Sequence, residues 1–306
     1  MTADAKERTA PDRLAAAEGF IWLTARVLEQ RRFAHLVRAG SPAAGATALD
    51  AYRSADGGYA YALDPDVRGP VSQPLGAHAA LTTLDEIGRW SGAAADGIVD
   101  QLATITLPDG GIPAVDPAGR DYPHPPFMPI DEDPPGALLT TALVAGVLHK
   151  NSSTHPWLAP ATEFCWQRID ALTESHPYEV HAAGAFLDHV PDRERAAAAA
   201  ARLGRMVRAQ GIVVLDPQRP EDSHLVPGYA PGEWHFVPDY ARDPGSLARE
   251  WFSEAEITAG LDALAQDQCE DGGWPIRWRQ WAPGTALESR PRVTIDALRT
   301  LQAYGR

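Results

Sequence analysis

Cysteine is scarce in this sequence, because the chain of 306 residues has only Cys165 and Cys269. Two thiols are too few for a disulfide framework, and no Cys-x-x-Cys pair is present to hold a structural zinc ion. The glycine-rich loops that bind phosphates and the Gly-x-Ser-x-Gly turn of serine hydrolases are missing as well. We therefore expect neither nucleotide-dependent chemistry nor serine hydrolysis.

Long apolar runs and an excess of basic residues are also absent. The longest apolar stretch, residues 137–148, is too short to span a bilayer, and residues 1–13 lack the apolar segment of a secretory signal. Lys and Arg number 27 against 41 Asp and Glu, which leaves a net charge of −14. That charge repels nucleic acid and anionic lipid surfaces. We expect a soluble, cytoplasmic protein without a membrane span whose partner is a small molecule; composition does not indicate its oligomeric state.

Helical periodicity dominates what is present. Apolar residues recur every three or four positions along most of the chain, and only residues 212–215 form a convincing strand-like run. Proline stands near the start of many helical segments, where its missing N–H is harmless. We predict a disordered tail over residues 1–10 and one all-α domain over residues 11–306. The expected helices cover 12–37, 74–91, 94–106, 135–150, 157–173, 177–190, 192–209, 244–253, 254–268 and 291–304.

A repeated triplet indicates that these helices belong together. Asp-Gly-Gly occurs at residues 56–58, 109–111 and 271–273, so the first interval is 53 residues and the second is 162. Both intervals fit a period of about 54 residues, which suits a helical hairpin with a long loop. After a helix, glycine allows a left-handed turn and aspartate bonds to backbone N–H groups. Such hairpins must stack to bury their apolar faces, which predicts an open solenoid or a closed ring.

The segment over residues 265–274 resembles the repeat of terpene cyclases and protein prenyltransferase β-subunits. In that superfamily a glutamine near the end of an outer helix precedes a glycine and an aromatic residue, and these residues brace adjacent hairpins. Here Gln266 or Gln268, Gly273 and Trp274 match well, and the two earlier triplets match in part. The resemblance, which extends to actinobacterial members, implies an α/α toroid. It would have five to six hairpins, with long loops at one rim around a central pocket.

The catalytic motifs of that superfamily are not reproduced. The D-x-D-D tetrad with which class II terpene cyclases protonate an alkene is absent, and its nearest counterparts are residues 64–67 and 131–134. The D-D-x-x-D motif that holds magnesium diphosphate is missing too. Asp267 and Cys269 imitate two zinc ligands of the prenyltransferases, but no histidine follows His235. We therefore expect no cofactor: magnesium has no recognisable site, and zinc is not expected.

The loop over residues 56–73 carries the most chemistry and directly precedes a predicted inner helix. Two carboxylates so close together repel each other, which raises one pKa and can produce a general acid; an arginine would balance the charge. The alternative is a rigid loop whose aspartates accept backbone hydrogen bonds. We predict catalytic roles for Asp64, Asp66 and Arg68, and substrate-binding roles for Tyr59, Tyr61 and Gln73.

Two further loops and one helix supply the other predicted substrate-binding residues. The loop over residues 226–243 combines aromatic and polar side chains, as binding surfaces do. The final loop offers tryptophan faces for carbocations and arginines for anions. The alternatives are an aromatic lid folded on itself, tryptophans packed between layers, and a histidine that only fills space. The predicted residues are His78, Glu233, Trp234, His235, Trp278, Trp281, Glu288 and Arg290.

Three functions on this ring remain open from the sequence. The first is a terpene-cyclase-like enzyme that binds an apolar isoprenoid and cyclises or rearranges it by acid catalysis, with Asp64 or Asp66 as the proton donor and Arg68 as its charge partner. The second is a carbohydrate-active lyase, hydrolase or epimerase, which would place carboxylates across an open cleft. The third is a non-catalytic binding or scaffold protein, which a pocket filled by its own side chains would favour.

Overall fold

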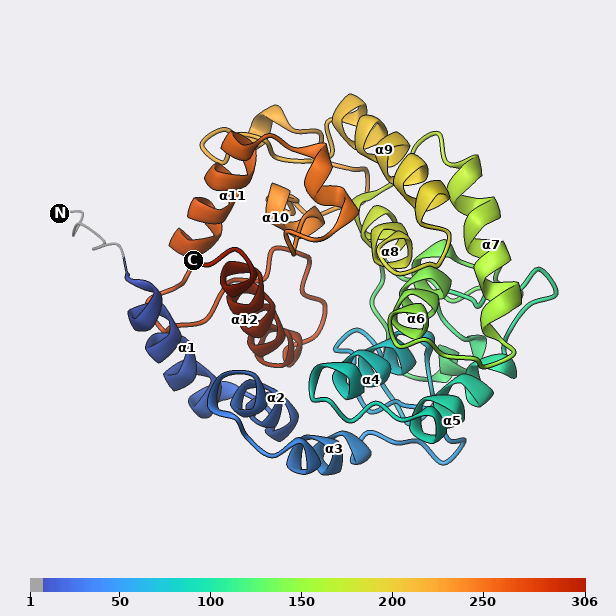
Figure 1. The fold of residues 1–306 in the computed structure, drawn as a ribbon. Helices are drawn as coiled ribbons and strands as arrows, with labels where there is room; N and C mark the ends of the chain where they lie inside the picture. Colours follow the sequence, from blue (N-terminus) through green and yellow to red (C-terminus); the bar gives the residue numbers. More distant parts are fainter. Residues whose placement is uncertain (1–7) are drawn as a thin grey trace.

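The computed structural model describes residues 8–306 and shows a ring of helices in two layers (Figure 1). Outer and inner helices alternate along the chain, so that consecutive helices form six hairpins. The outer helices are α1 (Ala10–Thr24), α3 (Pro42–Asp50), α5 (Gly92–Ala103), α7 (Leu158–Ala171), α9 (Arg193–Gln210) and α11 (Glu254–Gln266). The inner helices are α2 (Val27–Arg38), α4 (Pro74–Glu86), α6 (Leu138–Lys150), α8 (Pro177–Leu187), α10 (Val237–Tyr240) and α12 (Thr285–Ala303). The predicted all-α toroid is confirmed.

Three short 3₁₀ helices and a few isolated bridges complete the secondary structure. The 3₁₀ helices are η1 (Pro117–Asp121), η2 (Pro220–Asp222) and η3 (Leu247–Trp251). Within residues 8–306 there is no β-strand, and Val214 of the strand-like run makes only a single bridge with Phe236. None of the helices in this range combines the length and apolar character needed to cross a bilayer.

The disordered tail predicted over residues 1–10 meets the start of the first helix at Ala10. Residues 1–7 of that tail lie outside the described residues. Of the remainder, Ala10 is the first residue of α1, and the hydroxyl of the preceding Thr9 accepts a hydrogen bond from the Asp12 N–H. A threonine at this position satisfies one of the free N–H groups of the first turn.

The single helix predicted over residues 12–37 is in fact two helices. The backbone is extended at Ala25 and Arg26, where α1 ends and α2 begins. Arg26 accounts for the break: its guanidinium bonds to Glu29 at 2.7 Å and to the carbonyl oxygen of Ala62, in the loop between α3 and α4. Helical periodicity continues across the corner, so the sequence pattern could not show it.

Short elements account for the remaining differences. The small-residue helix α3 and the single turn α10 were not predicted, because nine and four residues are too few for a periodic pattern. The helix expected over residues 244–253 is only the 3₁₀ turn η3. The last helix starts at Thr285 and carries Pro291 in its interior, whereas the prediction placed this proline at the start.

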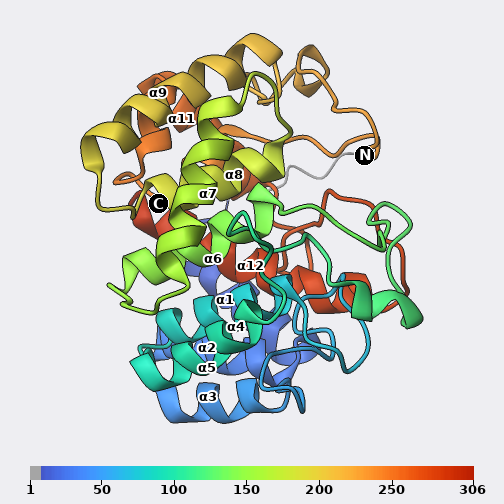
Figure 2. The same cartoon turned by 90° about the vertical axis from the view of Figure 1, so that its right-hand side faces the viewer.

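The long connections lie at one rim of the ring, as the sequence predicted. Residues 51–73, 104–137, 211–236 and 267–284 each join an outer helix to the next inner helix. Figure 2 shows these loops gathered on the right-hand side of the molecule. The links from inner to outer helices are mostly short and lie on the opposite side, so the loops define a mouth at one end of the ring.

The three Asp-Gly-Gly turns share one geometry. Gly57, Gly110 and Gly272 have φ of 93°, 89° and 91°. In each turn the aspartate accepts a hydrogen bond from the N–H of the second glycine, at 3.0 to 3.1 Å. The predicted left-handed glycine and backbone-bonded aspartate are therefore present in all three copies.

The last of these turns closes the ring. A Cβ on Gly272 would lie 2.1 Å from the carbonyl oxygen of Ala16 in α1, so only glycine allows this approach. Gly110 docks on Pro160 of α7 in the same way, with a corresponding distance of 2.5 Å. Hairpin six thus joins hairpin one by the same kind of contact that joins hairpin three to hairpin four.

Gln268 and Trp274 brace this junction as the resemblance implies. The Gln268 side-chain amide donates to the carbonyl oxygen of Arg13 at 2.9 Å. Trp274 is fully buried, and its indole N–H donates to the carbonyl oxygen of Leu264 at 2.7 Å. Both side chains therefore hold outer helices in place rather than facing the pocket.

Candidate functional site

The inner helices present a half-exposed face toward the ring axis. In α6, Leu139 and Leu143 are half-buried whereas the other residues from 138 to 148 are buried. Because α7 covers the outer side of α6, and α4 and α8 flank it, the half-exposed side faces the axis (Figure 1). His78 of α4 and His181 of α8 are also half-buried, and each lies four residues after the proline that starts its helix. We call this axial space the lumen.

The loop that carries the predicted acid is held in a strained conformation. Tyr61 and Ala62 are consecutive residues with φ of 56° and 59°, in the left-handed region that side chains other than glycine's rarely adopt. The Tyr61 N–H donates to the carbonyl oxygen of Gly69 at 3.0 Å, and Arg26 holds the Ala62 carbonyl. Backbone strain of about 1 to 3 kcal/mol per residue persists only where surrounding contacts enforce it, often at functional sites.

Asp66 is the carboxyl group with the most altered acidity in the loop. Its Oδ1 accepts a hydrogen bond from the Trp281 indole N–H at 2.8 Å. No side chain or backbone group of residues 8–306 bonds to its Oδ2. Burial, followed by repulsion from Asp64, raises the pKa of Asp66 to about 6, although Trp281 and two arginines oppose the shift. Asp66 therefore exchanges a proton near neutral pH.

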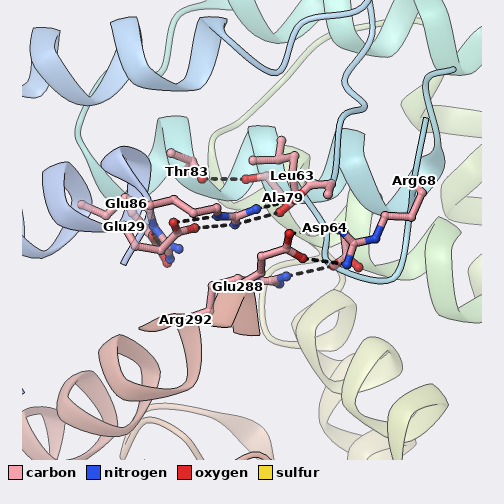
Figure 3. A network of polar contacts seen from close by, with 12 residues as sticks. Glu29, Leu63, Asp64, Arg68, Ala79, Thr83, Glu86, Glu288 and Arg292 are labelled. Carbon is pink, nitrogen blue, oxygen red and sulfur yellow. Dashed lines mark hydrogen bonds and ion pairs between the residues drawn. The ribbon is translucent and has the colours of Figure 1, made fainter. Parts of the chain in front are cut away.

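Asp64 has a different environment, two residues away. Its Oδ1 accepts a hydrogen bond from the Asp66 N–H at 3.1 Å, and its Oδ2 lies 3.1 Å from Nη1 of Arg292 (Figure 3). Two adjacent carboxyl groups are thus separated in role, since one is paired with a cation and the other is not. The alternative prediction for this loop is that both aspartates accept hydrogen bonds from the backbone. Asp64 accepts such a bond, whereas Asp66 accepts none from residues 8–306.

Arg68 does not pair with either aspartate. Its guanidinium forms an ion pair with Glu288 at 2.7 Å and lies 5.6 Å from the centre of the Trp281 ring (Figure 3). The prediction that Arg68 is the charge partner of the acid is therefore corrected. The arginine that forms an ion pair in this loop is Arg292 of α12, and its partner is Asp64. Arg68 instead joins the loop to Glu288 of α12 and to the ring of Trp281.

The ion pairs Arg68–Glu288 and Arg292–Asp64 lie beside further ion pairs on α2, α4 and α12 (Figure 3). Arg32 bonds to Glu86 at 2.6 Å with both side chains nearly fully buried, and Arg299 of α12 pairs with the same carboxylate. Arg26 pairs with Glu29 at 2.7 Å. Buried pairs of this kind hold fixed geometry, because separating them leaves a desolvated charge. The network fixes three inner helices behind the Asp66 loop.

A narrow cleft opens beside Asp66. Its enclosed volume is about 20 Å³, room for roughly one water molecule. Asp66 is the one carboxylate that residues 8–306 contribute to its lining, and most other lining residues are apolar or proline. The cleft runs between two mouth loops and is lined by Asp66, Val67, Arg68, Gln73, Val115, Gly119, Pro123, His124, Pro125, Met128 and Ile130.

His78 lies on the lumen face of α4. Its Nε2 is 3.1 Å from the Thr82 hydroxyl one turn below. Burial, and to a smaller degree the charge of Arg292, lowers the pKa of His78 to about 4, although Asp64 opposes the shift. The imidazole is therefore neutral at physiological pH and can accept a proton from a bound molecule.

A second polar cluster lies farther round the ring, between α8 and the end of the loop over residues 211–236. The Tyr178 hydroxyl donates to Oε1 of Glu233 at 3.0 Å. The His181 and His235 rings lie 5.2 Å apart, and the Tyr178 ring meets that of His235 edge-on at 5.0 Å. Glu233 and His235 were predicted from the sequence, and the structure brings them together with each other but not with the Asp66 loop.

Three predicted substrate-binding side chains are occupied by structural contacts. Tyr59 is 1% exposed and lies in the core, and both ends of the buried Gln73 amide bond to the backbone of Asp116, at 2.8 and 3.2 Å. Arg290 forms a bidentate pair with Asp271 of the ring-closing turn, at 2.7 and 2.8 Å. These three predictions are corrected: the residues shape the loops and close the ring.

The predicted wall of tryptophans is reduced to Trp281. Trp234 and Trp278 are half-buried and make no side-chain hydrogen bond or ring stack with residues 8–306. Tyr61 is 49% exposed at the rim and points no polar group at Asp66. Sequence reasoning missed Arg292, Tyr178 and His181 as site residues, because helical residues gain a common face only when the ring is assembled.

No bound metal is indicated by the geometry of the described chain. Across residues 8–306, no three His, Cys, Asp or Glu side chains are grouped so that they could hold an ion. Cys165 is buried, and Cys269 lies beside the ring-closing turn.

Comparison with solved structures gives the fold a context. A protein from Actinoplanes has a TM-score of 0.63 and 17% sequence identity, over 97% of this chain and all of that one. A variant of the type II terpene cyclase MstE from Scytonema, in complex with its substrate geranylgeranyl dihydroxybenzoate, has a TM-score of 0.57 and 13% identity, over 96% and 98% of the two chains. The apo form of MstE has a TM-score of 0.51 and 14% identity, over 94% and 86%.

These likenesses concern the fold, since all identities are below one fifth. No family model and no curated protein sequence matches the chain. The chain has a terpene-cyclase-like fold.

Proposed function

We propose that this protein binds an apolar, isoprenoid-type small molecule at the mouth of the ring and protonates it, with Asp66 as the acid. The terpene-cyclase-like fold supports the choice of ligand class, and the MstE complex with geranylgeranyl dihydroxybenzoate is an example of such a ligand on this fold. The apolar lining of the cleft, which includes Val67, Val115, Met128 and Ile130, agrees with a hydrocarbon chain.

The observation that carries the proposal is the state of Asp66. Its pKa of about 6 leaves part of the population protonated near neutral pH, and its Oδ2 has no partner within residues 8–306. The Trp281 N–H stabilises the carboxylate that remains after proton transfer. The Arg68 guanidinium already lies over the Trp281 ring, and the face of the ring turned away from Arg68 would stabilise a cation formed in the substrate.

Proton balance requires an acceptor as well as a donor. Protonation of an alkene carbon by Asp66 forms a C–H bond and leaves a carbocation, and loss of a proton from another carbon restores a double bond. His78 is suited to accept that proton, because it is neutral and faces the lumen. The substrate and the product then have the same elemental composition.

A second candidate function is non-catalytic binding. The enclosed volume of about 20 Å³ beside Asp66 is far smaller than an isoprenoid chain, so the mouth loops must move to admit one. A protein that uses the ring for binding alone would show the same compact resting structure. A carbohydrate-active function receives less support, since the cleft holds no carboxylate opposite Asp66.

The test is incubation of the purified protein with farnesol, geranylgeraniol or squalene in heavy water, followed by mass spectrometry of the products. We expect an isomeric product that has gained deuterium at carbon. Asp66→Asn should abolish turnover and retain binding, whereas the control Asp131→Asn, in an exposed loop position, should leave turnover unchanged. Binding without turnover in every case would support the non-catalytic function, and absence of both would refute the proposal.

A further inference from the structure

The fifth inner position of the ring differs from the other five. Its helix α10 has 4 residues, whereas the inner helices α8 and α12 have 11 and 19. The loop that precedes α10 crosses the mouth end of α8. This loop is anchored at both ends, because the His224 N–H donates to Gly211 at 2.7 Å and the Val214 N–H donates to His235 at 2.8 Å. Residues 225–234 form an excursion between these anchors.

Two hydrogen-bonding side chains, the ring of Tyr229 against Tyr178 and His235, and the packing of Val226 on the core hold this excursion to the ring. Glu233 accepts hydrogen bonds from the Tyr178 hydroxyl at 3.0 Å and from the Ala230 N–H at 2.8 Å. The Tyr229 hydroxyl lies 3.1 Å from Nδ1 of His176. The side chains of Glu233 and Tyr229 therefore make the two hydrogen bonds that join the excursion to α8 and to His176, the residue before α8.

The excursion has features of a segment that can move. Gly228 and Gly232 have φ of 90° and 85°, and a Cβ at either glycine would meet nothing within 4 Å. Of residues 225–234 only Glu233 is buried. Segments with few buried contacts and free backbone turns have low local stability and open without unfolding the rest of the protein.

Beneath the excursion lies an unsatisfied pair of imidazoles. Nε2 of His181 and Nε2 of His235 are shielded from solvent and have no hydrogen-bond partner within residues 8–306. A buried polar atom without a partner costs about 1 to 3 kcal/mol. Packing against the Tyr178 and Tyr240 rings holds the two histidines in this position. The unpaired ring nitrogens therefore destabilise the closed arrangement, and movement of the excursion would let water bind to them.

We propose that residues 225–234 are a movable lid on the α8 side of the lumen, held closed by the Glu233–Tyr178 and Tyr229–His176 contacts and opposed by the unpaired His181 and His235. Opening admits water to both imidazoles and uncovers the lumen face of Tyr178. This lid does not depend on Asp66 or on any reaction, so it can be tested separately from the proposed function.

Acidification should favour the open lid. Burial lowers the pKa of His235 to about 4 and that of His181 well below its usual value, so both are neutral when covered. A solvated imidazole has a pKa of about 6.5, so protonation below that pH favours the open state. The charged or titratable groups that face the two histidines are His176, Tyr178, Tyr229, Asp239, Tyr240, Arg242 and Arg277.

Hydrogen exchange measured by mass spectrometry tests the lid on the full chain. We expect Tyr178→Phe to speed exchange in residues 225–234 by about tenfold, with no change in α6, because it removes the hydrogen bond to the Glu233 carboxylate. Glu233→Gln should speed the same exchange by less, because an amide oxygen still accepts the two hydrogen bonds but more weakly than a carboxylate. Tyr304→Phe is the matched control, since it removes a tyrosine hydrogen bond of 2.9 Å to the Ala241 carbonyl oxygen, away from the lid.

The wild-type protein provides an independent arm. On going from about pH 7.5 to about pH 5, exchange in residues 225–234, corrected for intrinsic rates, should accelerate more than exchange in α6. Equal protection of the lid in Tyr178→Phe and Tyr304→Phe would overturn the proposal. So would a loss of protection spread evenly over the chain, or a lid indifferent to pH.

Discussion

Trp281 and Asp66 are 215 positions apart in the chain, yet the indole N–H donates to the carboxylate at 2.8 Å. This bond joins the final mouth loop to the loop between α3 and α4. It stabilises the ionised form of Asp66, while burial and Asp64 favour the protonated form. Because the effects that raise the pKa of Asp66 outweigh those that lower it, this carboxyl group titrates near neutral pH.

Asp66→Asn should stabilise the protein at neutral pH. The pKa of Asp66 is raised to about 6 in the folded chain, so its contribution to stability is full below about pH 3.8 and is lost as the pH rises through 6. A neutral amide avoids this loss, for a gain of about 2 kcal/mol at pH 8. Urea unfolding at pH 8 and pH 4 measures the effect; an equal gain at both values would contradict it.

Trp281→Phe should raise the pKa of Asp66 further. The substitution keeps an aromatic ring and removes the donor, so the carboxylate loses a hydrogen bond worth about 1.5 to 3 kcal/mol. The pKa of Asp66 in this variant can be measured from unfolding free energies. The measurement compares Trp281→Phe with the double variant Trp281→Phe/Asp66→Asn as a function of pH, and the midpoint of the difference gives the pKa. Trp278→Phe, with no such bond, should leave the midpoint near 6, and a shift there would argue against a specific role for Trp281.

Arg292→Met should shift the same midpoint upward, because Arg292 lowers the pKa of Asp66 and neutralises Asp64. Without this cation the two carboxyl groups repel more strongly. The exposed Arg279, changed to Met, serves as the control for loss of one positive charge at the rim. Identical midpoints in the two variants would show that the Asp64 pair does not tune Asp66.

Arg290→Ala should weaken the fold and leave ligand binding intact. The side chain pairs with Asp271, donates to the Trp274 carbonyl oxygen at 3.2 Å and lies 4.6 Å from the centre of the Phe20 ring. Losing these half-exposed contacts at the ring junction should cost about 1 to 2 kcal/mol. Thermal unfolding and the affinity for a bound prenol separate the two effects; weaker binding with unchanged stability would restore Arg290 to the site.

Gly57→Ala and Gly272→Ala form a matched pair of variants. Both glycines have φ near 90°, so both substitutions carry backbone strain of about 1 to 2 kcal/mol. A Cβ at Gly57 meets nothing within 4 Å, whereas at Gly272 it lies 2.1 Å from the Ala16 carbonyl oxygen. Gly272→Ala should therefore lose at least twice as much stability in denaturant unfolding. Equal losses would mean that the ring can open at this junction without penalty.

The helical content and the repeat were predictable because both depend on local physics. Apolar periodicity of 3.6 residues specifies an amphipathic helix wherever it continues for three turns, and the Asp-Gly-Gly turns recur with one geometry. Elements without enough residues for a pattern, α3 and α10, escaped notice. The break at Arg26 escaped because its partner, the Ala62 carbonyl, lies in another loop.

The candidate site was predictable only in part. Asp64 and Asp66 stand out in sequence as neighbouring carboxylates, but their partners come from α12 and the final loop. Arg68 was assigned to them by proximity along the chain, and the structure pairs it with Glu288 instead. Sequence distance is a poor guide to charge pairing when a ring brings its second and sixth hairpins together.

The sequence by itself determined the helices, the glycine turns and the position of the long loops, since each follows from residues close together along the chain. Only the tertiary structure decided which carboxyl group has altered acidity. The pKa of Asp66 depends on burial by loops from distant hairpins and on Trp281 and Arg292, which reach it only when ring closure brings the sixth hairpin beside the second. Electrostatic energies vary with distance and solvent exposure, and neither quantity is set until the ring has closed.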